Sequence, residues 1–198
     1  CRLNQAETAM LEQQFQRQGF RVVEPTEPAD VVVVNTCTVT EKSDTDTRRL
    51  VNRLTRLNPA TKIALIGCQS QVHKEALLAL KNVHWVIGNG SKMALSDIIL
   101  ETYDQVDPVV MTPKMDKRSF TMSDVGVDRR HIRANLKIQD GCDFFCAFCV
   151  IPFARGPARS REFDNILTEA KQLVAANHKE VILTGINVGT YSDKGKTI

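Results

Sequence analysis

The first hundred residues alternate between two spacings of hydrophobic positions. Apolar residues recur every three or four positions in 4–18 and again after Ser43, which predicts amphipathic helices. Short runs rich in β-branched residues lie between the helical stretches, and such runs are typical of buried parallel strands. They read DVVVVNTC, KIALIGC and VHWVI. The alternation predicts an α/β fold, with an open parallel sheet that carries helices on both faces.

Capping and stop residues set the limits of the predicted elements. Gly19 closes the first helix, Ser43 or Asp44 caps the second, and Asn58-Pro59 ends it. The predicted helices cover 4–18, 43–57, 73–80 and 91–101, and the predicted strands cover 20–23, 30–37, 62–68 and 83–87, with an edge strand at 108–111.

A second region begins after an irregular stretch. Residues 103–133 show no clear period, which predicts a linker between an amino-terminal domain, 1–102, and a second domain, 134–198. The second domain reads as a strand in ANLKIQDG, a helix from Asp164 and a strand in EVILTGI. One such unit cannot bury both faces of its sheet. We therefore expect this domain to be incomplete, with an open edge that promotes association.

Composition narrows the class of protein only slightly. The chain has 198 residues, 42% hydrophobic and 25% charged, with a net charge of +3, which permits a nucleic-acid partner without arguing for one. No apolar run approaches the length of a membrane span, and no signal peptide is visible, so we expect no membrane partner and a cytoplasmic location. The first residue is not methionine, so we expect a fragment.

Three of the six cysteines lie close together in DGCDFFCAFCVIP. Cys142, Cys146 and Cys149 follow a predicted strand, at the carboxyl end where parallel α/β proteins build their sites. A structural zinc ion needs four protein ligands, and no fourth Cys or His is near in sequence. A cubane iron–sulfur cluster accepts three cysteines and leaves one iron open. The alternative is three buried thiols in a core loop. We expect three aromatic rings to exclude water from the site: Phe144, Phe145 and Phe148.

The other three cysteines are far apart in sequence but equivalent in predicted topology. Cys37 and Cys68 each end a predicted strand, and Cys1 directly precedes the first helix. All three are therefore expected on the strand-to-helix side of one sheet, where they could form a second metal site. Taken singly, each could equally be a small core residue.

The cysteine motif resembles that of the radical SAM enzymes, because CDFFCAFC has their CxxxCxxC spacing with an aromatic residue before the last cysteine. An ordered set of segments resembles the methylthiotransferases more specifically, above all the bacterial branch that modifies threonylcarbamoyl-adenosine beside the tRNA anticodon. These segments are CRLNQAET, NTCTVTEKSD, IGCQSQ and LKIQDGCDFFCAFCVIPFARGPARSRE.

The resemblance implies two 4Fe-4S clusters and S-adenosylmethionine as cofactors. It assigns an auxiliary cluster to the first triad and the radical SAM cluster to the second, in a partial barrel that begins at residue 134. Phe148 would pack on the adenosyl group or shield the cluster, and Gly185 in TGIN would lie along the methionine part. No catalytic residue is identified. The implied metal ligands are Cys1, Cys37, Cys68, Cys142, Cys146 and Cys149.

The implied reaction adds a methylthio group to carbon 2 of the modified adenosine. One electron from a donor protein would cleave S-adenosylmethionine, and the resulting radical would remove hydrogen from the adenine carbon. The tRNA anticodon loop would be the partner. Arginines on both sides of the cysteine loop could hold its phosphates, or could instead form a solvated face or serve as a carboxylate partner for S-adenosylmethionine. They are Arg155, Arg159 and Arg161 downstream and Arg129, Arg130 and Arg133 upstream.

Other functions remain open at this point. Within the family, the substrate could be isopentenyl-adenosine or a ribosomal-protein aspartate. An electron-transfer protein would normally ligate its relay clusters fully, unlike these triads. A zinc-dependent RNA-binding module would hold zinc rather than iron and would not bind S-adenosylmethionine. The family also carries a carboxyl-terminal RNA-binding domain beyond these residues, so we expect the 198 residues alone to be inactive.

Overall fold

The computed structural model describes residues 1–38, 40–122 and 132–198, and these form two compact units. The four-strand unit comprises Arg21–Lys114 with Phe148–Arg155. The cysteine-loop unit comprises Cys1–Phe20, Met115–Ala147 and Gly156–Ile198. Units defined by packing in this way differ from domains defined by sequence pattern, and the domain limits at 102 and 134 stay a prediction.

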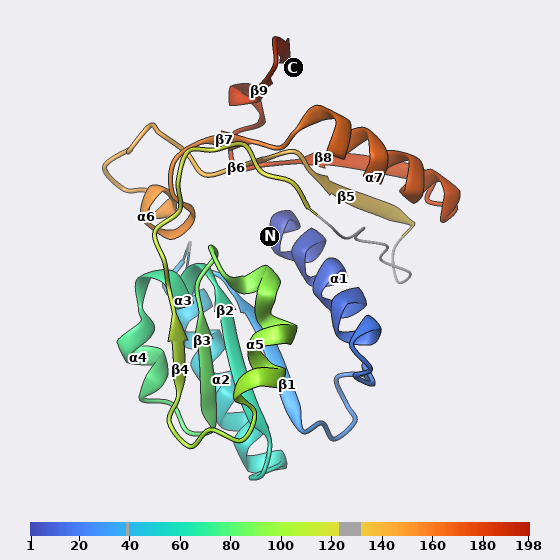
Figure 1. The fold of residues 1–198 in the computed structure, drawn as a ribbon. Helices are drawn as coiled ribbons and strands as arrows, with labels where there is room; N and C mark the ends of the chain where they lie inside the picture. Colours follow the sequence, from blue (N-terminus) through green and yellow to red (C-terminus); the bar gives the residue numbers. More distant parts are fainter. Residues whose placement is uncertain (39, 123–131) are drawn as a thin grey trace. The chain divides into compact units, whose positions relative to one another are not determined.

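The four-strand unit is built on a parallel sheet of order β1-β2-β3-β4. Figure 1 shows α2 and α5 on opposite sides of this sheet, which confirms the predicted open sheet with helices on both faces. The strands are β1 (Val31–Thr36), β2 (Lys62–Gly67), β3 (Val83–Ile87) and β4 (Val109–Met111), and the helices are α2 (Glu41–Leu57), α3 (Cys68–Val72), α4 (Lys74–Leu78) and α5 (Leu95–Thr102), with a 3-10 turn η1 (Lys92–Ala94) before α5.

Aliphatic side chains form the core of this unit on the α2 face of the sheet. The cluster joins Val51 of α2, Leu65 of β2 and Leu77 of α4, all almost completely buried. On the α5 face, the buried ring of Trp85 donates a hydrogen bond from Nε1 to Thr102 Oγ1 at 2.8 Å. The strands are thus covered on both sides, as a central parallel sheet requires.

The described residues of the cysteine-loop unit form three small two-stranded sheets. β5 and β8 pair in parallel, and β6 and β7 pair antiparallel at the base of the cysteine loop. The strands are β5 (Arg133–Lys137), β6 (Gln139–Asp140), β7 (Arg159–Ser160), β8 (Glu180–Thr184), β9 (Ser192–Asp193) and β10 (Lys196–Thr197), and the helices are α1 (Arg2–Arg17) and α7 (Phe163–Ala175), with a 3-10 turn η2 (Val188–Thr190). The loop itself carries α6 (Ile151–Arg155), which belongs to the four-strand unit.

Strand β5 lies between two helices because its side chains alternate. Ala134 and Leu136 are buried in the cluster that includes Ile166 of α7. Asn135 and Lys137 point the other way and contact the glutamine and glutamate side chains of α1. This period of two is that of a strand with both faces covered.

The structure corrects several predicted limits. Residues 20–23 form no strand, because Phe20 closes the end of α1: its N–H donates to Phe15 O at 3.0 Å and the two rings pack edge to face. Helix α2 begins at Glu41, since Thr40 rather than Ser43 or Asp44 is its cap and accepts from Ser43 N at 3.2 Å.

Two further predicted elements differ in their limits. The predicted helix 73–80 is found as the shorter α4, and the short helix α3 directly before it was not predicted. The predicted ANLKIQDG strand is divided into β5 and β6. The strand 83–87 and the edge strand near 108–111 are confirmed. None of the described helices has both the length and the apolar character needed to cross a bilayer.

Candidate cofactor site

Cys37 and Cys68 lie at the carboxyl ends of two neighbouring strands, as predicted. Strands β1 and β2 are paired through Thr36 and Gly67, and each cysteine is the next residue along its chain. Gly67 has φ +97°, and a Cβ there would lie 2.7 Å from Asn35 Oδ1 and 2.9 Å from Thr36 O. Glycine is therefore required for β2 to turn directly into α3.

Hydrogen bonds from neutral side chains hold these two positions. Thr36 Oγ1 donates to Ile66 O at 2.7 Å and accepts from Gln69 N at 3.2 Å, so it ties the end of β1 to the start of α3. Asn89, just beyond β3, donates from Nδ2 to Cys68 Sγ at 3.5 Å. Its Oδ1 accepts from the buried ammonium of Lys92 at 2.7 Å. N–H groups bonded to cysteine sulfur are among the features that tune iron–sulfur centres.

The cysteine loop is closed at its base by backbone contacts. Gly141 has φ +69°, and a Cβ there would collide with the carbonyl oxygen of Pro157. Cys142 N donates to Gly156 O at 3.1 Å, and β6 and β7 pair immediately outside this bond. Two strands that approach so closely leave no room for a side chain at Gly141. Cys142 therefore leaves the carboxyl end of β6 in a fixed direction.

The two predicted cysteine triads are both divided between the compact units. All six cysteines are free, and they range from exposed Cys1 and Cys146 to buried Cys68. Cys1, Cys142 and Cys146 belong to the cysteine-loop unit, and Cys37, Cys68 and Cys149 belong to the four-strand unit. Within residues 1–38, 40–122 and 132–198, no three His, Cys, Asp or Glu side chains are arranged to hold a metal ion. The two ligand sets therefore stay predictions.

Helix α1 does not share the sheet of Cys37 and Cys68, which corrects the sequence argument for Cys1. Its buried side chains, such as Leu3 and Met10, belong to the cysteine-loop unit, where α1 packs against β5. The reason is the alternation along β5 described above, which presents polar partners to α1.

The aromatic rings of the loop do not exclude water in this structure, contrary to the expectation from sequence. Phe144 is 66% exposed, Phe145 is 61% exposed and Phe148 is 93% exposed. Phe145 also has φ +45°, a conformation that costs a non-glycine residue about 1 kcal/mol or more. The loop therefore presents its rings to solvent.

Buried charges surround the start of the loop. Lys137 Nζ lies 2.6 Å from both Glu7 Oε1 and Asp140 Oδ2, and all three side chains are at most 6% exposed. Asp140 Oδ1 accepts from Gly141 N at 2.9 Å. Arg159 Nη2 lies 3.4 Å from Asp140 Oδ2. This network connects α1 to the glycine turn that precedes Cys142.

Of the arginines predicted to contact RNA, two are buried. Arg161 is 1% exposed and pairs with Glu169 of α7, and its Nη1 also donates to Lys137 O at 3.1 Å. Arg155 is also 1% exposed. A buried guanidinium cannot reach a phosphate, so the RNA role is not proposed for these two residues. The partner of Arg161 is a carboxylate of the protein itself. Arg133 pairs with Glu180 at 2.8 Å, and Arg129 and Arg130 lie outside the described residues.

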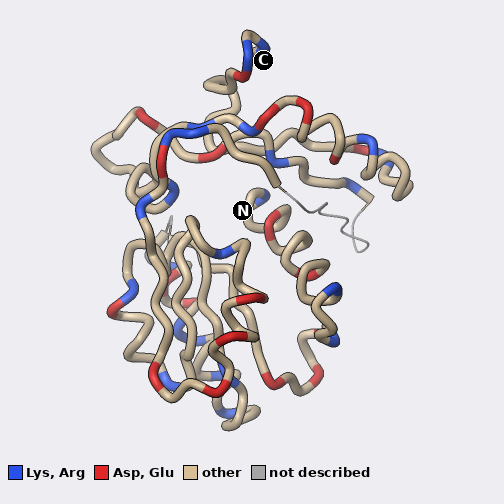
Figure 2. Tube along the Cα trace, viewed as in Figure 1, with Lys and Arg blue, Asp and Glu red and all other residues tan. Residues whose placement is uncertain are grey.

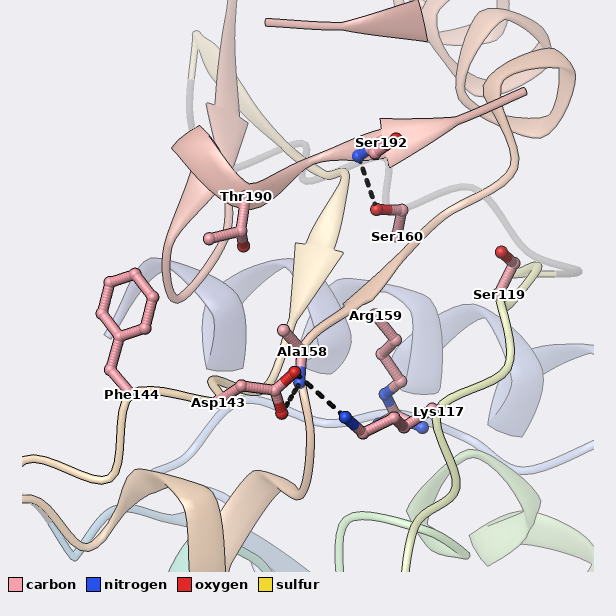
Figure 3. Close-up of a pocket in the computed structure, with 9 residues that line it drawn as sticks. All are labelled: Lys117, Ser119, Asp143, Phe144, Ala158, Arg159, Ser160, Thr190 and Ser192. Carbon is pink, nitrogen blue, oxygen red and sulfur yellow. Dashed lines mark hydrogen bonds and ion pairs between the residues drawn. The ribbon is translucent and has the colours of Figure 1, made fainter. Parts of the chain in front are cut away.

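Arg159 lines a polar pocket within the cysteine-loop unit (Figure 3). Two of the lining residues form an ion pair, with Lys117 Nζ 3.3 Å from Asp143 Oδ2. Asp143 Oδ1 accepts from Ala158 N at 3.1 Å. Hydroxyl groups complete the wall, and Ser160 Oγ accepts from Ser192 N at 2.9 Å. Figure 2 shows positive and negative residues interspersed along the described chain, in agreement with its small net charge. The lining residues are Lys117, Ser119, Asp143, Phe144, Ala158, Arg159, Ser160, Thr190 and Ser192.

Gly185 follows β8 and packs against Gln139 of β6. A Cβ on Gly185 would lie 2.9 Å from Gln139 Oε1 and 2.9 Å from Val188 Cγ1. The sequence argument singled out Gly185 but missed Gln139, Thr36 and Asn89. Each of these three residues ends or follows a strand, so the rule that placed the cysteines would also have selected them.

Two family models match the chain. Residues 1–88 match the uncharacterized protein family UPF0004, and residues 136–198 match the radical SAM superfamily. The solved structure of the radical S-adenosylmethionine methyltransferase TsrM from Kitasatospora setae, with cobalamin and a [4Fe-4S] cluster bound, is similar with a TM-score of 0.59 at 18% identity. The match covers 93% of this chain and 47% of the TsrM chain, and it shows that the two have the same fold over this region.

Curated relatives match almost the whole chain. The threonylcarbamoyladenosine tRNA methylthiotransferases MtaB of Bacillus subtilis and Aquifex aeolicus are 36% and 37% identical, over 99% and 98% of this chain. The tRNA-2-methylthio-N(6)-dimethylallyladenosine synthase of Anaplasma marginale is 34% identical over 96%. The chain spans 44%, 48% and 42% of these relatives, less than half of each. Relatives and family models agree, and the chain belongs to the radical SAM methylthiotransferase family.

Proposed function

We propose that the protein is a radical SAM tRNA methylthiotransferase that acts on carbon 2 of threonylcarbamoyl-adenosine beside the anticodon. The observation that carries this proposal is the cysteine loop, whose CxxxCxxC spacing begins at the carboxyl end of β6 behind a required glycine. The three relatives named for threonylcarbamoyladenosine among those compared are 36%, 37% and 33% identical, and the first two named for dimethylallyladenosine are 31% and 34% identical. The first substrate is therefore preferred.

The number and kind of free cysteine side chains suit two iron–sulfur clusters with three protein ligands each. All six thiols are free to ligate, and an amide N–H already bonds to Cys68 Sγ. We assign one cluster to Cys142, Cys146 and Cys149 and the auxiliary cluster to Cys1, Cys37 and Cys68. When bound, a four-iron cluster with S-adenosylmethionine on its open iron supplies radical chemistry at an unactivated carbon.

The chain's own residues would bind and orient the cofactor. Gly185 follows β8 and packs against Gln139, and its backbone would lie along the methionine part of S-adenosylmethionine. The ring of Phe148, 93% exposed, is free to pack on the adenosyl group. Arg159 and Lys117 offer partly exposed cations for RNA phosphates near the loop. The remaining partners are the tRNA anticodon loop and an electron-donor protein, and the proposed location is the cytoplasm.

Metal analysis tests the cofactor assignment. The protein is reconstituted without oxygen, and iron and sulfide are measured in the wild type and in the Cys142→Ala/Cys146→Ala/Cys149→Ala variant. We expect about eight irons in the wild type and about four in the variant. The Cys1→Ala/Cys37→Ala/Cys68→Ala variant is the matched control and should keep the other four. Zinc without iron in the wild type would instead favour the RNA-binding module.

Nucleoside analysis tests the substrate. The chain is expressed from its intact gene in a bacterium that lacks methylthio groups on both modified adenosines. Mass spectrometry of digested tRNA should show 2-methylthio-threonylcarbamoyl-adenosine. A methylthio group found only on isopentenyl-adenosine would overturn the choice of substrate but keep the reaction.

A further inference from the structure

We propose that Gln139 is a positioning residue that fixes the turn after β8 against the start of the cysteine loop. The proposal rests on the function proposed above, because it concerns how two parts of the S-adenosylmethionine site are held in register. Both parts belong to the cysteine-loop unit: Gly141 and Cys142 on one side, and 185–187 on the other.

The side chain of Gln139 is completely buried and makes three hydrogen bonds. Its Nε2 donates to Asp140 O at 2.9 Å and to Gly141 O at 2.8 Å. Its Oε1 accepts from Asn187 N at 2.9 Å. Both N–H donors of the amide are thus used on the loop side, and the carbonyl oxygen is used on the β8 side. One side chain joins two backbone segments 48 residues apart.

Gln139 stands where regular strand pairing stops. The pairing of β5 with β8 ends at Lys137 and Thr184, and Ile138 N donates one more bond to Thr184 O at 2.9 Å. Beyond that bond, one segment turns into the cysteine loop and the other into the turn that contains Gly185. The amide of Gln139 spans the two diverging segments and takes the place of a further ladder bond.

Gly185 makes the contact specific. A Cβ there would lie 2.9 Å from Gln139 Oε1 and 3.0 Å from Gln139 Cβ, closer than side chains normally approach. The missing side chain at this position therefore accommodates the amide. A buried amide whose partners are all backbone groups also fixes one register, because any shift would leave a buried polar atom unpaired.

The consequence for the proposed function is geometric. The cofactor would touch the open iron held by the loop and the backbone at Gly185, and catalytic groups must keep their separation to about 0.5 Å. Gln139 would set that separation without touching the cofactor. Its loss should therefore weaken the binding of S-adenosylmethionine while leaving the cysteines able to hold iron.

The test compares Gln139→Met and Gln139→Glu with Gln172→Met, which alters an exposed glutamine on α7. Amide hydrogen exchange is measured first on the iron-free chain. Both Gln139 variants should exchange faster at 140–142 and 185–188, with strand β2 unchanged. Gln139→Glu keeps the acceptor for Asn187 N but places a carboxylate against two carbonyl oxygens, so it should perturb the loop side more than the β8 side.

The second readout is S-adenosylmethionine binding after reconstitution, followed by equilibrium dialysis and by the change in the cluster's electron paramagnetic resonance signal. Gln139→Met should keep the iron content of the wild type and bind S-adenosylmethionine about tenfold more weakly. The Gln172→Met control should match the wild type in both measurements.

The outcomes separate this proposal from the proposed function. Wild-type protein that holds iron but binds no S-adenosylmethionine would overturn the proposed function. The exchange measurement would still test whether Gln139 holds the two backbone segments together. Equal affinity and equal exchange in the Gln139 variants would overturn the positioning role. If Gln139→Met does not fold, Gly185→Ala is measured instead, because its added methyl group would displace the amide of Gln139. Unchanged exchange at 140–142 in that variant would also overturn the positioning role.

Discussion

The two strand ends that carry cysteines are held by different means. In the four-strand unit, Cys37 and Cys68 are placed by the register of a parallel sheet over an aliphatic core, and Thr36 links the ends of their strands. In the cysteine-loop unit, Cys142 follows a strand of two residues that is fixed by buried charges and by a buried amide.

The difference shows what a small sheet requires. A four-stranded sheet fixes its edge through many repeated backbone bonds, and no single side chain decides the position. A two-stranded sheet is only marginally stable by itself and needs further interactions with its surroundings. In the cysteine-loop unit these interactions are buried ion pairs, and breaking one of them costs several kcal/mol. Substitutions in the two units should therefore differ in size and in which part of the molecule responds.

The largest effect is expected from Lys137→Met. It removes the ammonium that lies between the buried carboxylates of Glu7 and Asp140, which should lower the free energy of unfolding by about 3–5 kcal/mol. Urea denaturation followed by circular dichroism measures this loss. Trp85, the only tryptophan in the chain, lies in β3 and reports on the other unit by fluorescence.

Lys171→Met is the matched control for this substitution, because Lys171 is exposed on α7. A Trp85 transition that shifts as far as the circular dichroism transition would contradict the comparison. It would mean that the two units unfold together, and that the stability of each does not depend on its own core alone.

Leu65→Ala should act on the other unit. The side chain is completely buried in the aliphatic cluster of the sheet, so its removal leaves a cavity and costs about 2–5 kcal/mol. The Trp85 fluorescence transition should move to lower urea. Leu57→Ala, at a residue 73% exposed on α2, should leave that transition in place. Equal shifts for the two variants would contradict the assigned core.

Thr36→Val should have a smaller effect. It keeps the shape of the side chain but removes the bond to Ile66 O and the acceptor for Gln69 N, at a cost of about 1–3 kcal/mol. Iron retained by a Cys142→Ala/Cys146→Ala/Cys149→Ala background should fall with it. Thr26→Val, at an exposed turn of the same unit, is the control. Unchanged iron would show that strand register alone places the two cysteines.

The smallest effect is expected from Arg118→Ala. The hydrogen bond from the Arg118 side chain holds the pKa of the Asp116 carboxyl below its usual value, although both groups are exposed. A lowered folded-state pKa stabilises the fold above the unfolded pKa, and the stabilisation is lost as pH falls through the folded pKa. The variant should therefore raise the pKa of Asp116, as followed by nuclear magnetic resonance. Because solvent screens this exposed pair, stability at neutral pH should fall only slightly. An unshifted pKa would contradict the pairing.

The sequence predicted the sheet of the four-strand unit well because its signals are local. Runs such as VVVV and IALI specify buried strands wherever the chain places them, and the parallel register then puts Cys37 beside Cys68. Local signals failed at 20–23, where Phe20 packs on Phe15 to close a helix instead of entering a sheet. The cap of α2 also differs from the prediction, because the hydroxyl of Thr40, three residues before Ser43, accepts the bond from the first turn.

Contacts between distant segments could not be read from the sequence. Helix α1 joins β5 because Glu7 meets Lys137, a pairing across 130 residues that no periodicity reveals. The burial of Arg161 depends in the same way on Glu169 in the following helix. Of the candidate site, the motif spacings and the residues at strand ends were predictable. The contacts that Gln139 and Asn89 make with distant segments were not.

The closed base of the cysteine loop also bears on the entropy of ligand capture. The bond from Cys142 N to Gly156 O joins the ends of the loop whatever the thiols between them are doing. The entropic cost of bringing two ends of a chain together grows with the logarithm of the length of the loop. Here the ends come together when the protein folds, before any ligand binds. A ligand that binds several of these thiols has only the interior of the loop left to order. The loop is thus partly preorganised for a ligand that binds several thiols, and its affinity should depend on Gly141 as well as on the sulfur atoms.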